Sequence, residues 1–359
     1  FGLPYAFAQS GVGIGLLWLF IIGGIITILQ LMLAEVSIQT RGQERLVGLV
    51  KRYVGRPWQW IALGGLSLGI WGAMLAYMLV GGKFLHLLLS GTFGGSEAFF
   101  SLVIWGISAA MIYRGLGFAA KYEIGIVIAL LFLFVFIILL SLPEISFANY
   151  LSFDSSQAFA PYGVILFSIA GIGIVPEMAQ MLGRRQKKDL GRSVIIAMAV
   201  IIALYALFSL AVVGVTGSGT TEAAFDGLVP IFGNSFRIIA TLLGSITILS
   251  IYMILGIEIL NTFRVDFKMT HKHAWLLSVI VPLALFFFGI REFISLIGFV
   301  GGVLGGILGI LIALTYWNMK RSPLCVKQHC INFPSVLTWA IIILFSGGVL
   351  AQIISVLVK

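Results

Sequence analysis

Long apolar runs alternate with short polar segments along the whole chain. The apolar runs fall near residues 13–34, 58–82, 98–113, 122–142, 161–182, 194–215, 231–262, 275–290, 293–317 and 334–357. A helix needs about 20 mostly apolar residues to span a bilayer. The pattern therefore predicts ten membrane-spanning helices. The apolar stub ahead of them, Phe1–Gln9, is too short to cross, and we expect it to be the end of a truncated first span, the eleventh in all.

The composition points to the same class of protein. Hydrophobic residues make up 60% of the chain and charged residues only 10%, and the mean hydropathy is +1.12. A soluble domain carries roughly 25% charged residues because its surface faces water. The chain is therefore neither a soluble enzyme nor a nucleic-acid-binding protein, and its main surroundings are the lipid bilayer.

Groups that could support catalysis or metal binding do not converge on one site in the sequence. The histidines are scattered, at His86, His271, His273 and His329. Cys325, His329 and Cys330 lie close together, but a zinc site normally has four protein ligands, or three and a water. We expect no enzyme activity, no metal site and no cofactor.

The chain has a net charge of +9, and most of its Lys and Arg residues lie in the loops between the predicted spans. If the loop after residue 34 is cytoplasmic and the spans alternate, 18 of the 22 Lys and Arg residues fall on the cytoplasmic side, as the positive-inside rule requires. We therefore predict a multi-pass protein of the cell membrane with an extracellular C-terminus and cytoplasmic loops at 35–56, 114–121, 183–192, 264–273 and 319–332. Within the first of these loops, Thr40–Gly55 predicts an amphipathic helix along the inner interface.

One span is interrupted in its middle. The segment Phe167–Glu177 contains Gly171, Gly173 and Pro176, with a carboxylate directly after the proline. Glycine lets the backbone leave helical geometry, and proline suits the first turn of a new half-helix. The pattern favours a broken helix over a kinked but continuous one. Secondary transporters bind substrates and ions at such breaks.

A second Gly/Pro pair lies in the N-terminal stub, at Gly2 and Pro4. Five spans separate the two interruptions, five more follow, and one is left over. This order predicts an inverted repeat: residues 1–142, an extracellular loop at 143–160, a second half at 161–318, and an additional span at 334–357.

The stretches FGLPYAF…SG and FSIAGIGIVPEM, with the basic loop GRRQKKDLGRS, resemble the first and sixth helices of the amino acid/auxin permease family. That family belongs to the amino acid–polyamine–organocation superfamily. The resemblance implies an all-α membrane protein with the LeuT-type fold of five plus five helices, here with one extra helix. It also implies an ion- or proton-coupled amino acid symporter that works by alternating access, as a monomer or weak oligomer.

The resemblance also implies a substrate site made of backbone groups at the two breaks. The matching positions are Gly2, Leu3, Pro4, Phe167, Ser168, Ala170 and Gly171. In the third span, Tyr77 is either a pocket side chain or an aromatic that fills the bundle. Phe167 either covers the substrate or packs.

Two kinds of coupling ion are compatible with the residues. A sodium site in this fold would use hydroxyls of the eighth span, where Ser245, Thr247 and Ser250 are available, but Ile251–Leu260 offers none. Protons are favoured, because a carboxylate away from water is easily protonated. Glu177 is the first candidate since it adjoins the break, and Glu258 is the second unless it pairs with Arg264 or a backbone group.

Other carboxylates and small residues have structural interpretations. Glu35, beside the basic loop, is expected to be structural. Six glycines in the span 293–317 predict close helix packing, at Gly298, Gly301, Gly302, Gly305, Gly306 and Gly309. A sodium-coupled symporter and a non-transporting amino acid sensor on the same fold stay open as alternatives, and the substrate amino acid is not specified by these patterns.

Overall fold

The computed structural model describes residues 2–40, 44–171, 173–182, 187–322 and 332–357. Within these ranges every regular element is a helix. The longer helices are α1 (Leu3–Ser10), α2 (Val12–Gln39), α3 (Leu46–Tyr53), α4 (Arg56–Phe93), α5 (Glu97–Arg114), α6 (Leu116–Ser141), α7 (Ala160–Ile169), α8 (Ile174–Leu182), α9 (Lys187–Thr216), α10 (Phe225–Asp266), α11 (His271–Phe287), α12 (Phe293–Phe299), α13 (Gly306–Arg321) and α14 (Ser335–Leu357). The short turns are η1 (Leu142–Glu144), η2 (Phe147–Tyr150), η3 (Ser155–Gln157) and η5 (Gly217–Gly219), and η6 (Val300–Gly305) is a π-helix.

Each of the ten predicted spans is helical in the structure. Nine segments are long and apolar enough to cross a membrane, among the residues described, and the tenth, α11, is a shorter apolar helix of 17 residues. The chain is therefore a multi-pass membrane protein. Some helices are longer than the apolar runs that predicted them. Helix α4 continues to Phe93, and α10 begins at Phe225 with a kink at Gly233, where φ is +79°.

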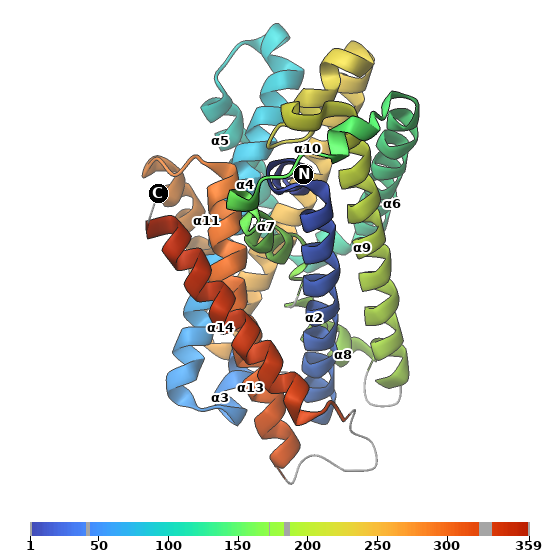
Figure 1. Ribbon diagram of the computed structural model, residues 1–359. Coiled ribbons are helices and arrows are strands. Elements are labelled where there is room, and N and C mark those ends of the chain that lie inside the picture. Colours follow the sequence, from blue (N-terminus) through green and yellow to red (C-terminus); the bar gives the residue numbers. More distant parts are fainter. Residues whose placement is uncertain (1, 41–43, 172, 183–186, 323–331, 358–359) are drawn as a thin grey trace.

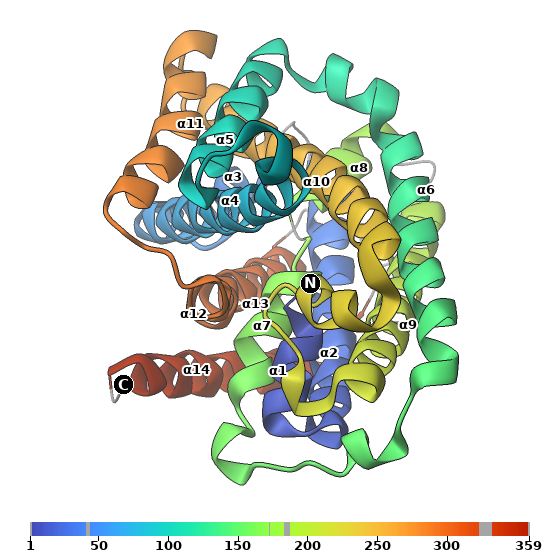
Figure 2. The ribbon, with the colours of Figure 1, turned by 90° about the horizontal axis from the view of Figure 1, so that it is seen from above.

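The helices form a bundle in which α4 and α10 pack against each other near the centre (Figures 1 and 2). Helices α6 and α9 lie side by side along one flank, and α11 lies on the opposite flank (Figure 2). The additional helix α14 packs against α13 at the edge of the bundle. We call the end of the bundle that carries α3 the α3 end, and the opposite end, which carries η2, the η2 end (Figure 1).

Glycines set the close spacing around α12, η6 and α13, as the sequence predicted. A side chain at Gly301 would overlap the backbone of Gly163 and Phe167 in α7. Gly306 and Gly309 leave room for Val349 and Phe345 of α14. The π-helical turn η6 was not predicted. It lies between α12 and α13, where α7 packs against both α12 and η6.

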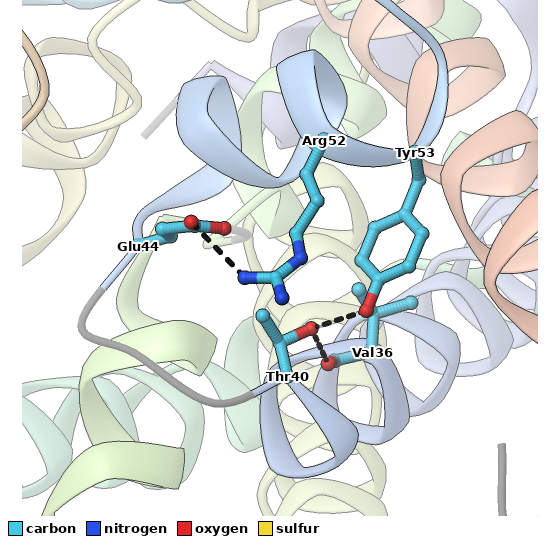
Figure 3. Close-up of polar contacts among 5 residues, drawn as sticks. All are labelled: Val36, Thr40, Glu44, Arg52 and Tyr53. Carbon is cyan, nitrogen blue, oxygen red and sulfur yellow. Dashed lines mark hydrogen bonds and ion pairs between the residues drawn. The ribbon is translucent and has the colours of Figure 1, made fainter. Parts of the chain in front are cut away.

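The amphipathic helix predicted within Thr40–Gly55 is present as α3. Its apolar residues Leu46, Val47, Leu49 and Val50 are buried against other helices of the protein, mainly α4 and α13. Hydrogen bonds tie it to the end of α2, since Tyr53 Oη lies 2.8 Å from Thr40 Oγ1, which itself donates to the carbonyl of Val36 (Figure 3). The apolar face of α3 therefore belongs to the protein core.

Candidate functional site

The interrupted span consists of two half-helices. Helix α7 ends at Ile169 and α8 begins at Ile174, and Ala170, Gly171 and Gly173 between them are not helical. This confirms the broken helix predicted from the glycines and Pro176. Pro161 opens α7 and Pro176 lies in the first turn of α8, where a missing backbone donor costs nothing.

A cavity of about 250 Å³ borders this break. Its walls come from α4, the break, α10 and the segment η6–α13, with Leu46 of α3 on one side. The lining is mainly apolar, and its residues are Leu46, Leu66, Gly69, Ile70, Ala73, Tyr77, Phe167, Ser168, Ala170, Gly171, Gly173, Ile251, Leu255, Glu258, Val300, Gly301, Leu304, Gly305 and Leu308. Five of the predicted substrate-binding positions thus lie together here, Tyr77, Phe167, Ser168, Ala170 and Gly171, and so does the coupling candidate Glu258.

Two aromatic rings meet at the edge of the cavity. The rings of Tyr77 and Phe167 have centroids 5.9 Å apart and are inclined by 41°. The backbone nitrogen and Cβ of Phe167 lie close against Gly301 of η6. The sequence left open whether Tyr77 lines a pocket or fills the bundle, and in the structure it lines the cavity.

Tyr205 of α9 contacts the end of α7 next to the break. Its hydroxyl donates a hydrogen bond to the backbone carbonyl of Ser168, 3.2 Å away, in the last turn of α7. The last carbonyls of a helix have no partner within the helix. Tyr205 was not among the residues predicted for the site. The available signal was a tyrosine inside an apolar span, since a buried phenol needs a hydrogen-bond partner.

Glu258 is the one carboxylate among the described residues that line the cavity. It faces Gly173, where any side chain would overlap its carboxylate. The alternative pairing with Arg264 is absent among the described ion pairs, and Thr262 donates to the backbone carbonyl of Glu258 rather than to its side chain. Among the described residues that line the cavity, the one acid therefore lies next to the break.

Glu177 occupies a different position. It lies on α8 outside the cavity lining, and its carboxylate accepts a hydrogen bond from the guanidinium of Arg45, just before α3. The side chains are 15% exposed for Arg45 and 18% for Glu177, so the pair is largely shielded from water. This ion pair joins the half-helix α8 to α3, which gives Glu177 a structural contact that the sequence did not predict.

The remaining predicted positions do not line the cavity. Gly2, Leu3 and Pro4 form the start of α1, where Gly2 lies against Ile294 and Ile297 of α12. The Ser245 hydroxyl donates to the carbonyl of Thr241, 2.7 Å away, and Thr247 bonds within its own helix in the same way.

Further predicted residues have only structural contacts or fall outside the site. Ser250 is buried in α10, away from the cavity lining. Glu35 is buried and accepts a hydrogen bond from Gln39, in keeping with a structural role. Cys325, His329 and Cys330 lie outside the described residues. In the described part of the chain, no three His, Cys, Asp or Glu side chains are close enough to hold a metal ion.

A broken helix beside a small cavity, within an all-helical membrane bundle, is an arrangement found in secondary transporters. Comparison with solved structures shows that the fold is of the LeuT type. The chain is similar to MhsT in complex with L-phenylalanine, with 16% identity, a TM-score of 0.69, and coverage of 99% of this chain and 93% of that one. Mhp1, a nucleobase-cation-symport-1 family transporter with bromovinylhydantoin bound, is 15% identical, with a TM-score of 0.66 and coverage of 87% and 74%. Inward-facing Mhp1 gives 15% identity, a TM-score of 0.64 and coverage of 98% and 85%.

The family follows from the sequence of nearly the whole chain. Residues 1–354 match the tryptophan/tyrosine permease family, and the chain belongs to that family. It is therefore a transporter and not an enzyme. A search of curated protein sequences found no significant match. The LeuT-type fold expected from the two Gly/Pro motifs is confirmed, whereas membership of the amino acid/auxin permease family stays a prediction.

Proposed function

We propose that the chain is a symporter that carries an aromatic amino acid, tryptophan or tyrosine first, across the cytoplasmic membrane together with a proton. In this proposal the α3 end faces the cytoplasm and the η2 end faces outward, as the Lys and Arg distribution favours. The observation that carries the proposal is the cavity of about 250 Å³ beside the break, which has an aromatic pair and a single carboxylate in its described lining.

The chemistry of the cavity suits an amino acid with a large apolar side chain. Backbone groups released by the break at Ala170, Gly171 and Gly173 can bind the charged ends of a zwitterion. The rings of Tyr77 and Phe167 and the apolar walls suit an indole or phenol ring, since aromatic pairs gain energy beyond their buried area. The family of the chain and the phenylalanine bound to MhsT support the same substrate class.

Proton coupling is supported by the position of Glu258. A charged carboxylate inside a membrane protein is costly unless it is paired, and such residues mark proton pathways in transporters. Glu258 lies in the cavity wall beside Gly173 of the break, without an ion pair among the described residues. The hydroxyls expected for a sodium site, on Ser245 and Ser250, lie away from the cavity lining, which favours the proton over sodium.

Alternating access would use the break as its hinge. The half-helices α7 and α8 are separated by non-helical residues, so α8 can move without α7. The ion pair between Glu177 and Arg45 holds α8 to α3 in the present conformation. Opening toward the α3 end would separate these two groups, whereas α7 stays fixed against Gly298 and Gly301.

Uptake into proteoliposomes tests the proposal. We expect tritiated L-tryptophan to accumulate when the interior is more alkaline than the exterior, and not when only a sodium gradient is imposed. Glu258→Gln should abolish accumulation driven by the proton gradient but retain binding. The matched control is Glu44→Gln, which changes a carboxylate at the α3 end outside the cavity.

The other outcomes separate the alternatives. Accumulation that follows the sodium gradient and ignores pH would establish a sodium symporter. Saturable binding without flux under either gradient would establish a sensor. Wild-type pH dependence in Glu258→Gln would remove Glu258 from proton coupling.

A further inference from the structure

The segment that joins α6 to α7, residues 142–159, exposes large apolar side chains at the η2 end of the bundle. We call this segment the α6–α7 loop. It runs along the rim of the bundle between the two helices (Figure 2). The exposed fractions of Phe147, Leu151 and Phe153 are 80%, 83% and 67%. Large apolar side chains gathered on an exposed segment indicate an interaction with a membrane or another partner.

The polar groups of the same loop face the protein. The backbone N–H of Ser146 donates to the carbonyl of Gly214 at 2.9 Å, and the Asn149 side chain donates to the same carbonyl at 2.7 Å. The Tyr150 hydroxyl donates to the carbonyl of Leu210 at 2.9 Å. Gly214 lies in the last turn of α9, where carbonyls have no partner within the helix. The loop therefore has its polar side on the protein and its apolar side outward, the reverse of a water-exposed loop.

The second half of the loop is tied to α1 and α2. Gly11, where these two helices meet, has a φ of +95°, and a side chain there would lie 2.8 Å from the carbonyl oxygen of Ser152. The indole N–H of Trp18 donates to the carbonyl of Ala158 at 2.8 Å. Contacts on both halves thus fix the backbone of the loop, so the outward direction of its apolar side is set by the fold.

The lipid-facing surface of α6 continues into the loop. The apolar segment Ile124–Glu144 is long enough to cross a membrane, and only 17% of its most apolar stretch is buried in the protein. Val135, Leu139 and Leu142 are exposed and recur every three or four residues, so they form one stripe on the helix. Phe147 follows this stripe after five residues. The apolar side of the loop therefore begins where the surface that faces the acyl chains ends.

Charge indicates the kind of membrane surface that the loop fits. The α6–α7 loop contains two exposed carboxylates, Glu144 and Asp154, and no Lys or Arg. Anionic lipid surfaces attract clusters of basic residues. The two carboxylates would be repelled by such a surface, so the loop fits lipids with no net charge.

We propose that the α6–α7 loop is a lipid anchor, in which Phe147, Leu151 and Phe153 insert into the interfacial region of a bilayer of zwitterionic lipids. Aromatic and leucine side chains bury their apolar surface at this depth. The hydrogen bonds of Asn149 and Tyr150 transmit the anchorage to α9, so the loop fixes the level at which the η2 end meets the membrane. This surface lies apart from the cavity, and the inference does not depend on the substrate or the coupling ion.

Spin labels on the loop test the proposal. Phe147→Cys, Leu151→Cys and Phe153→Cys are made one at a time in full-length protein that carries Cys325→Ser and Cys330→Ser. Each is labelled with a nitroxide and placed in phosphatidylcholine nanodiscs. We expect relaxation by oxygen, which concentrates in lipid, to exceed relaxation by a water-soluble nickel chelate severalfold at all three positions. The matched control is Ser218→Cys, an exposed polar position in η5 next to η2, where the nickel chelate should dominate.

The other outcomes contradict the proposal in distinct ways. Dominant relaxation by nickel at the three loop positions would show that the apolar side faces water. Protection from both reagents, with spin–spin broadening between chains, would show that a second copy covers the patch. Oxygen contact that appears only after phosphatidylglycerol is added would overturn the assignment to zwitterionic lipids. The three labels report separately, so a variant that does not fold leaves two positions that decide the question.

Discussion

The hydroxyl of Tyr205 donates a hydrogen bond to the backbone carbonyl of Ser168, 3.2 Å away, at the point where α7 stops being a helix. The two residues come from different spans. The carbonyl at the end of α7 has lost its helical partner, and a buried carbonyl without a partner is costly in a membrane. Tyr205 therefore stabilises the end of α7 in the position that the cavity requires.

Replacing this tyrosine should affect transport more than stability. Tyr205→Phe removes one neutral hydrogen bond, which is worth about 0.5–1.5 kcal/mol of unfolding free energy. Because the end of α7 then loses its fixed position, we expect the maximal uptake rate of tryptophan to fall severalfold. Thermal unfolding in detergent and initial rates in proteoliposomes measure the two effects.

Tyr150→Phe is the matched control for this prediction. The Tyr150 hydroxyl donates to the carbonyl of Leu210, also on α9, at 2.9 Å, and neither residue lines the cavity. Its removal should cost a similar stability and leave uptake unchanged. Equal loss of uptake in both variants would show that Tyr205 has no special relation to the break.

The two glycines of the break should respond differently to alanine. A side chain at Gly173 would overlap the carboxylate of Glu258, whereas a side chain at Gly171 meets no atom within 4 Å. In Gly173→Ala the flexible end of Glu258 must move aside, so we expect the unfolding free energy to change by no more than about 1 kcal/mol while proton-driven uptake falls strongly.

Gly171→Ala provides the comparison, since both glycines line the same cavity. It should retain the wild-type dependence of uptake on the pH gradient, even if the Michaelis constant for tryptophan changes. A Gly173→Ala variant with normal proton-driven uptake would show that the position of Glu258 beside the break is unimportant.

The sequence predicted the spans and the break because both depend on local composition. Twenty apolar residues have few alternatives to a membrane helix, and Gly171, Gly173 and Pro176 interrupt a helix through their own backbone chemistry. Close packing at Gly301 was predicted for the same reason, since small residues at regular spacing allow helices to approach.

Side-chain contacts between segments far apart in the sequence could not be predicted from local composition. Arg45 and Glu177 are 132 positions apart, and the sequence showed only a carboxylate next to a break, which favoured a proton-coupling role. Tyr205 and Ser168 are 37 positions apart on separate helices. Such pairs follow from how the helices pack, which hydrophobic patterning along one chain does not determine. The π-helical turn η6 depends on the same packing.

The ion pair between Glu177 and Arg45 leads to a prediction that differs from the one made from sequence. Glu177→Gln leaves the largely shielded guanidinium of Arg45 without its ion-pair partner, so the unfolding free energy should fall by about 1.5–3 kcal/mol. The dependence of uptake on the pH gradient should remain, because Glu258 rather than Glu177 lines the cavity.

The exposed ion pair at the same end of the bundle is the control. Glu44 pairs with Arg52 at 3.2 Å, and their side chains are 37% and 34% exposed (Figure 3). Exposed pairs contribute about 0–1 kcal/mol, so Glu44→Gln should change thermal unfolding less than Glu177→Gln does. A Glu177→Gln protein that is stable but has lost its pH dependence would restore the proton-coupling role to Glu177.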